Sequence, residues 1–166
     1  ARAMGLDENA TKVIEFAAML HDVGKLGVRD DVLLKPGKLT AEEYEKIKEH
    51  ALYTSKILNS IEFSRDLRDV PQVASMHHER VDGKGYPYGV SGEQISLAAR
   101  ILAVADVFDA LTSYDRPYKR ALSIEEAIEV MKKGRGTQFD PKVVDIFVEK
   151  KLYQIERREF QRLNAD

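Results

Sequence analysis

The sequence predicts an all-α, single-domain fold, and three observations lead to this prediction. Apolar residues recur with helical spacing along nearly the whole chain, and no segment shows a convincing strand pattern. Helix start signals recur too, as two capping boxes and one Asp-Pro pair. The length of 166 residues, with a hydrophobic content of 43%, suits one domain with a full core. We therefore expect residues 1–166 to form one helical bundle.

The first half of the chain is expected to hold three helices. Residues 9–22 place apolar side chains on one face and are followed by helix-breaking glycines. A capping box that begins at Thr40 predicts a helix over 41–60. A proline in the first turn supports a helix over 70–79, which would carry two histidines at its C-terminal end.

The second half is expected to begin with a glycine-rich loop, 83–92. A largely apolar helix over 95–113, with Ala105 on its buried face, should follow. A second capping box predicts a helix over 123–133. An N-cap aspartate followed by proline predicts a last helix from 140 towards 163 that could be broken.

Charge and composition exclude several classes of function. The chain has 26 basic and 28 acidic residues, a formal charge of −2, so no overall field attracts a nucleic-acid polymer or an anionic membrane. The absence of cysteine excludes disulfides and thiolate metal sites. No apolar run approaches the roughly 18 residues of a spanning helix, and no signal peptide is visible. We expect a cytoplasmic protein, and the start at Ala1 suits a fragment of a longer one.

The most informative stretch begins with two adjacent histidines. His77, His78 and Glu79 run directly into a glycine-rich turn that ends at Tyr86 and Pro87. Imidazole and carboxylate groups together are typical ligands of divalent transition metals. Because the chain holds only four histidines, two in succession are notable. The alternative is a helix end with exposed or capping histidines.

A second group of polar residues follows the first predicted helix. His21 and Asp22 precede a short turn that also carries Lys25. A carboxylate can bridge two metal ions, and a nearby lysine can hold a phosphate. A lone histidine at a helix end, however, often only satisfies the last carbonyls.

Asp106 lies inside an apolar helix, where an unpaired charge would cost several kcal/mol. Its partner would be a metal or one of three basic residues: Arg100, Arg116 or Lys119. A helix bundle can bring such inward donors together. The candidate ligands are His21, Asp22, His50, His77, His78 and Asp106. Six donors exceed the needs of one tetrahedral structural ion and fit two ions that share a carboxylate.

Taken together, these motifs resemble the HD-GYP family, bacterial phosphodiesterases that hydrolyse the second messenger cyclic di-GMP. The segments that carry the resemblance are His21-Asp22-Val23-Gly24-Lys25, residues 34–40, His50, His77 to Pro87, and Asp106 to Thr112 with Arg116 to Lys119. They extend over about residues 5–150. The resemblance implies a helical bundle of the HD-domain type.

The resemblance also implies roles for individual residues. The first metal would be held by His21, Asp22 and Asp106, with Asp22 bridging, and the second by His50, His77 and His78. Substrate phosphates would meet Lys25, Arg116 and Lys119. Glu79 and Asp109 would support the site, and its edge would be formed by Gly85, Tyr86 and Pro87. The metals would be iron or manganese.

Two departures from the family pattern stand out. Family members have an upstream helix with a further metal-binding histidine, and in some a glutamate associated with a third metal, but no histidine precedes His21 here. We therefore expect the chain to lack that helix and any attached sensory or receiver domain. Tyr114 also makes the interval between Asp109 and Arg116 one residue longer than in the commonest form.

The leading hypothesis is a metal-dependent cyclic di-GMP phosphodiesterase. A hydroxide held between two ions would attack phosphorus, and Asp22 and Lys25 would be the catalytic residues. The product would be pGpG, with a second cut to GMP left open. By resemblance, the loop at 85–87 would dock diguanylate cyclase (GGDEF) domains. The alternatives are an HD-type phosphohydrolase for another nucleotide, including cyclic GMP-AMP, and a catalytically silent receptor.

Overall fold

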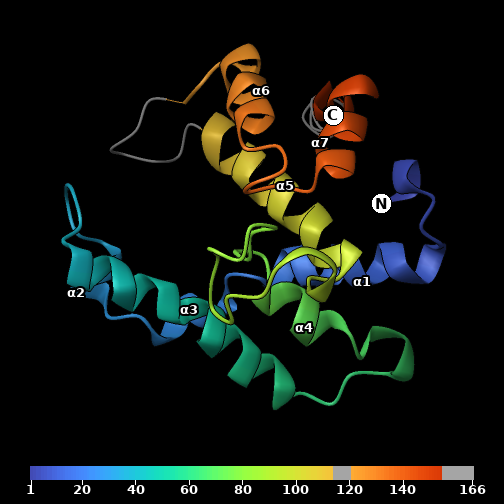
Figure 1. The fold of residues 1–166 in the computed structure, drawn as a ribbon. Helices are drawn as coiled ribbons and strands as arrows, with labels where there is room; N and C mark the ends of the chain where they lie inside the picture. The colour runs from blue at the N-terminus through green and yellow to red at the C-terminus, as the bar shows by residue number, and fades with distance from the viewer. Residues whose placement is uncertain (114–120, 155–166) are drawn as a thin grey trace, which may run out of the picture.

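The computed structural model describes residues 1–113 and 121–154, and within these ranges the protein is all-α, as predicted (Figure 1). The α-helices are α1 (Glu8–Leu20), α2 (Asp30–Leu33), α3 (Ala41–Asn59), α4 (Val70–Ser75), α5 (Leu97–Thr112), α6 (Ile124–Lys133) and α7 (Pro141–Glu149). Short 3-10 helices include η1 (Arg2–Met4), η2 (Val23–Gly27), η3 (Arg65–Leu67), η4 (Gly92–Gln94) and η5 (Leu152–Gln154). In the described part of the chain, strand-like pairing is limited to an isolated bridge between Arg135 and Phe139.

The predicted start signals are confirmed in detail. At the start of α3, the Thr40 side chain accepts from the Glu43 amide, and the Glu43 carboxylate accepts from the Thr40 amide. The same reciprocal pair opens α6. Asp140 caps α7 by accepting from two backbone amides. These caps satisfy N–H groups that have no partner within the helix.

Two predicted helices end earlier than expected. Helix α4 stops at Ser75, so His77 and His78 lie in the turn after it and not in its last turn. The His77 ring hydrogen-bonds the Ala74 carbonyl at 2.6 Å, an acceptor that a continued helix would use for its own backbone. Helix α7 ends at Glu149, although a helix towards residue 163 was predicted. Residues 155–163 of that prediction lie outside the described ranges.

Helix α5 crosses the molecule and contributes to two hydrophobic clusters (Figure 1). The first cluster packs Ala99 and Leu102 of α5 against α1 and α4, and the second packs Val104 and Phe108 of α5 against α6 and α7. Helix α3 packs against α4 and η2. Ala105, predicted to be buried, is exposed, because the two clusters cover other faces of α5. The ends of α1 and α4 and the middles of α3 and α5 thereby come together.

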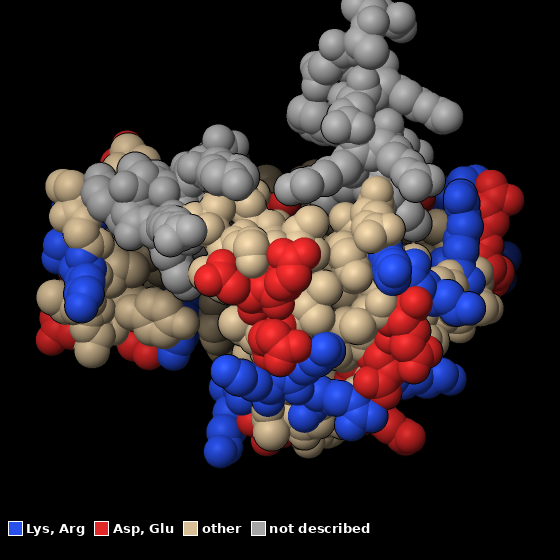
Figure 2. All heavy atoms as spheres, turned by 90° about the horizontal axis from the view of Figure 1, so that it is seen from above, with Lys and Arg blue, Asp and Glu red and all other residues tan. Residues whose placement is uncertain are grey.

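The surface carries charges of both signs. Figure 2 shows basic and acidic side chains on the same face, as the small net charge leads one to expect. In the described ranges, no helix combines the length and apolar character needed to cross a lipid bilayer.

Candidate metal centre

Four separate segments supply the side chains of the candidate centre. His21 is the C-cap of α1, and Asp22 follows it at the start of η2. His50 lies in the middle of α3, and Asp106 lies on α5. The fourth segment is the turn after α4, which carries His77 and His78. All six predicted ligands therefore lie where these elements meet.

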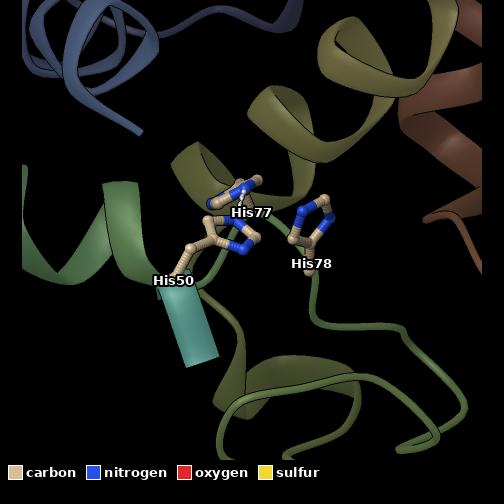
Figure 3. Close-up of side chains that lie close together, drawn as sticks. All are labelled: His50, His77 and His78. Carbon is tan, nitrogen blue, oxygen red and sulfur yellow. Dashed lines mark hydrogen bonds between the residues drawn. The ribbon is translucent and has the colours of Figure 1, made fainter. Parts of the chain in front are cut away.

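The ligand atoms form two overlapping groups. The nitrogens of His50, His77 and His78 lie within 4.8 Å of one another, and so do one atom each of His21, Asp22 and His77. Figure 3 shows the first group, with the His50 ring reaching from α3 towards the two rings that follow α4. His77 belongs to both groups, whereas the sequence analysis assigned it only to the group of His50 and His78.

The two carboxylates connect the imidazoles. Asp22 places Oδ2 at 3.4 Å from Nε2 of His21 and Oδ1 at 3.4 Å from Nε2 of His50. Asp106 places Oδ1 at 3.4 Å from Nε2 of His21 and Oδ2 at 4.0 Å from Nδ1 of His78. Each carboxylate thus faces histidines from two different segments. The predicted bridging role of Asp22 fits this placement.

Three of the four rings are oriented in the same way. Nδ1 of His21, His50 and His77 lies 2.6 to 2.7 Å from the carbonyl oxygen three residues earlier in the chain. A carbonyl only accepts, so each Nδ1 carries the hydrogen and donates it. Nε2 is then left for the interior of the cluster. Such outer contacts are what orient metal-binding histidines in proteins.

This tautomer assignment makes the cluster suitable for cations. Nε2 of His50 faces Nε2 of His77 at 3.4 Å (Figure 3). If both rings are neutral and protonated at Nδ1, both of these buried nitrogens are acceptors and neither can donate to the other. A divalent cation would satisfy both lone pairs at once. The donor set of imidazoles and carboxylates therefore fits divalent metal ions.

Burial keeps most of these rings neutral. It lowers the pKa of both His77 and His78 to about 3, with a further contribution from neighbouring imidazoles. Burial also lowers the pKa of His50. Burial also lowers the pKa of His21, but hydrogen bonds to Asp106 and Asp22 outweigh this effect. The pKa of His21 is therefore raised to about 10. The carboxylates that stabilise a proton there would equally stabilise a metal cation.

Lys25 lies beside the bridging carboxylate. Its Nζ is 2.5 Å from Oδ2 of Asp22. Although burial raises the pKa of Asp22, hydrogen bonds from His21 and Lys25 outweigh this and hold it well below its usual range. Lys25 is also partly exposed, so its ammonium can meet a ligand at the mouth of the cluster.

Thr54 is a positioning residue that the sequence analysis missed. Its hydroxyl donates to the His21 carbonyl at 2.8 Å and accepts from the Gly24 amide at 3.0 Å. Gly24 lies so close to α3 that a Cβ there would be 1.9 Å from the His50 carbonyl. Thr54 lies four residues after His50, on the same face of α3, and this spacing was the available signal.

The alternative partner Arg100 for Asp106 is wrong. Nη1 of Arg100 instead lies 2.5 Å from Oδ2 of Asp140, the N-cap of α7. The other two alternatives, Arg116 and Lys119, are also predicted phosphate contacts and lie outside the described ranges. Asp109 is exposed one turn beyond Asp106, where it accepts from the Ser113 hydroxyl at 3.4 Å.

The glycine-rich loop is attached to the cluster through Glu79. This buried carboxylate accepts from the amides of Tyr88 at 2.6 Å and Gly89 at 3.2 Å. Gly85 lies so close to the preceding turn that a Cβ would be 2.6 Å from the His78 carbonyl. Tyr86 places its ring 4.7 Å from the His78 ring, and Pro87 follows through a cis peptide bond. The loop therefore forms one wall of the centre.

Comparison with known proteins agrees with this fold and site. The HD domain model matches residues 1–143. The chain is 48% identical over 145 residues to the cyclic di-GMP phosphodiesterase response regulator RpfG of Xanthomonas campestris pv. campestris, covering 87% of this chain and 38% of that protein. It is 43% identical over 161 residues to a Thermotoga maritima cyclic di-GMP phosphodiesterase, covering 96% and 43%. It is 41% identical over 141 residues to the 3′3′-cGAMP-specific phosphodiesterase 3 of Vibrio cholerae, covering 85% and 30%.

An all-α fold with histidines and aspartates gathered between its helices defines an HD domain, and this chain belongs to the HD domain family. Its resemblance to the HD-GYP family is confirmed by the same matches. HD domains bind divalent metals, and the cluster provides the donors to do so. The chain spans less than half the length of these three relatives.

Proposed function

We propose that this chain is a metal-dependent phosphodiesterase that hydrolyses cyclic di-GMP to pGpG. One observation carries the proposal: six imidazole and carboxylate side chains from four segments converge, with Nε2 of His50 and Nε2 of His77 facing each other at 3.4 Å. Two of the relatives compared above are named for cyclic di-GMP hydrolysis. A second cut, to GMP, would use the same centre.

The proposed occupants are two divalent ions, iron or manganese, because mixed imidazole and carboxylate donors suit both. Asp22 would serve both ions, since its two oxygens face different histidines. His21 and Asp106 would complete one site, and His50 and His78 the other. His77 lies within reach of both groups. Bound ions of this kind lower the pKa of water and offset negative charge on phosphoryl oxygens.

The chain's own residues would position the substrate phosphate. Lys25 would donate from its ammonium to a phosphoryl oxygen beside Asp22, where it offsets the charge that grows in the transition state. Arg116 and Lys119 are proposed as further phosphate contacts. Gly85 and Tyr86, which line the cavity beside the centre, would limit the access of water.

The test combines metal analysis with product analysis. Purified protein, loaded with Mn²⁺ or Fe²⁺, is incubated with cyclic di-GMP, and the products are separated by chromatography. We expect pGpG from the parent protein, and loss of both bound metal and product with Asp22→Ala. Asp69→Ala, which changes an exposed carboxylate beyond η3, is the matched control and should behave as the parent. An Asp22→Ala protein that retains both metals would contradict the bridging role.

Two other functions are distinguished by the same assay. Binding of cyclic di-GMP without turnover by the metal-loaded protein would identify a silent receptor. Cyclic GMP-AMP is included as a second substrate because three Vibrio cholerae relatives, 38 to 41% identical, are named as 3′3′-cGAMP-specific phosphodiesterases. Faster cleavage of this ligand would reassign the substrate. We also propose, from the family resemblance, a cytoplasmic location, a linked sensory or receiver domain, and docking of GGDEF domains at 85–87.

A further inference from the structure

A cavity of about 340 Å³ opens beside the metal centre and shares His77 and His78 with it. Its other walls come from α3, from the glycine-rich loop and from the middle of α5. A volume of this size is typical of small-ligand sites. Within the described ranges, Lys25 does not line this cavity but lines another one, together with Asp22.

Two tyrosines and a lysine form the outer part of the cavity. Nζ of Lys48 lies 5.1 Å from the centre of the Tyr44 ring and 5.6 Å from the centre of the Tyr86 ring. Tyr44 is about half exposed, at 49%, so much of its surface is available to a ligand. Lys48 itself is held by Glu45 at 2.6 Å, which steadies its ammonium above the rings.

Three apolar side chains are part of the cavity lining: Ala103 and Val107 of α5, and Phe139. Flat aromatic rings beside apolar side chains favour a planar ligand, and every nucleobase can stack on such rings. The lining also includes the polar side chains of Glu79, Arg80, Lys84 and Gln138, so the cavity offers both a ring for stacking and groups for hydrogen bonds, as a base requires. Lys25 lines a different cavity, beside Asp22.

We propose that Tyr44, Lys48 and Tyr86 form a guanine-binding subsite, in which Lys48 selects guanine over adenine. Guanine presents two adjacent acceptors, O6 and N7, to an ammonium, whereas adenine presents a donor in place of O6. The exposed Tyr44 ring would stack on either base. This inference rests on the proposed function, because it assumes a cyclic dinucleotide as ligand. It adds the side chain that would distinguish guanine from adenine.

Binding to the metal-free protein tests the subsite without any need for turnover. Calorimetric titration is done with cyclic di-GMP and, separately, with cyclic di-AMP. We expect the parent protein to prefer cyclic di-GMP. Lys48→Met, which retains the apolar part of the side chain, should weaken binding of cyclic di-GMP about tenfold and leave cyclic di-AMP within about twofold. Tyr44→Ala should weaken both ligands, because stacking does not depend on the base.

Lys46→Met is the matched control, because Lys46 lies on the same helix but lines a different cavity. It should leave both affinities unchanged. Equal weakening of both ligands by Lys48→Met would indicate a phosphate contact and overturn the proposal. Unchanged affinities, or a parent protein that binds neither ligand, would overturn it too. A lysine-dependent preference for cyclic di-GMP, without hydrolysis by the metal-loaded protein, would instead reject the proposed catalysis and retain the subsite.

Discussion

At the scale of single residues, the centre is oriented by local contacts. Each of three histidines donates Nδ1–H to the carbonyl three residues earlier, so its own helix or turn sets the direction of Nε2. No distant partner is needed for this orientation. Long-range contacts enter only when the segments are brought together, as Thr54 does between α3 and the turn after His21.

Replacement of Thr54 by valine tests this positioning role. Valine has nearly the same shape as threonine but lacks the hydroxyl. The His21 carbonyl would lose its donor, and the Gly24 amide would lose its acceptor. We expect the affinity for Mn²⁺ to fall about tenfold, as for other contacts that support metal ligands. Thr54→Ser, which keeps the hydroxyl, should retain most of the affinity. Equal losses for valine and serine would show that packing at this buried position matters and the hydrogen bonds do not.

Removal of the Glu79 carboxylate tests the attachment of the loop. Glu79→Ala leaves the Tyr88 and Gly89 amides without their acceptor. We expect the free energy of unfolding to fall by about 1–3 kcal/mol, measured by urea denaturation. Glu79→Gln retains an acceptor oxygen and should lose less. If both variants were as stable as the parent, the carboxylate would not hold the loop.

The sequence singled out the six candidate ligands that the fold brings together, but it did not single out Thr54 or Lys48. Histidine is rare in this chain, and aspartate inside an apolar helix requires a partner, so residue type alone was informative. Thr54 and Lys48 are common residue types on an amphipathic helix. Their roles depend on which segments pack against α3 in the folded protein, and the local sequence does not specify this. The alternative that paired Arg100 with Asp106 failed for the same reason, since the partner of Arg100 is Asp140, 40 residues away.

At the scale of elements, helix starts were predicted better than helix ends. Capping boxes are local in sequence, so α3 and α6 could be placed to within a residue or two. Helix α4 ends at Ser75, two residues before His77, whose ring hydrogen-bonds the Ala74 carbonyl. His50 makes the same contact with the Ile47 carbonyl inside the continuous helix α3, so this residue type and spacing do not mark a helix end.

Gly85→Ala tests whether the loop must lie against the turn after α4. The added Cβ would meet backbone atoms at 2.4 to 2.6 Å, which cannot move without displacing the loop. We expect weaker binding of cyclic di-GMP and a loss of about 1–3 kcal/mol in stability, measured by calorimetry and by denaturation. Gly89→Ala is the control, because its Cβ would meet only a carbonyl at 3.9 Å and its cost is confined to a positive φ. Similar binding by both variants would rule out a need for close approach.

At the scale of the whole molecule, the centre joins parts of the chain that are distant in sequence. Its candidate ligands extend from His21 to Asp106 and come from α1, α3 and α5, which all pack against α4, and from the turns that follow α1 and α4. The two hydrophobic clusters hold these segments, but neither cluster includes the ligands themselves. Bound ions would therefore add a third set of interactions that the unfolded chain cannot form.

This arrangement predicts that divalent metal stabilises the fold as a whole. A ligand that binds only the folded state adds about 2.7 kcal/mol at a free concentration of 100 times its dissociation constant. For a chain of this size, that gain corresponds to a rise in Tm of about 5–10 °C. We expect Mn²⁺ to raise the Tm in thermal unfolding and EDTA to reverse the rise. The Tm of the Asp22→Ala variant should rise much less with Mn²⁺. The substitution removes a carboxylate whose two oxygens face His21 and His50, one from each group of histidines. Equal Tm values with and without metal in the parent protein would mean that the cluster does not bind cations in the folded state, and the proposed chemistry would lose its basis.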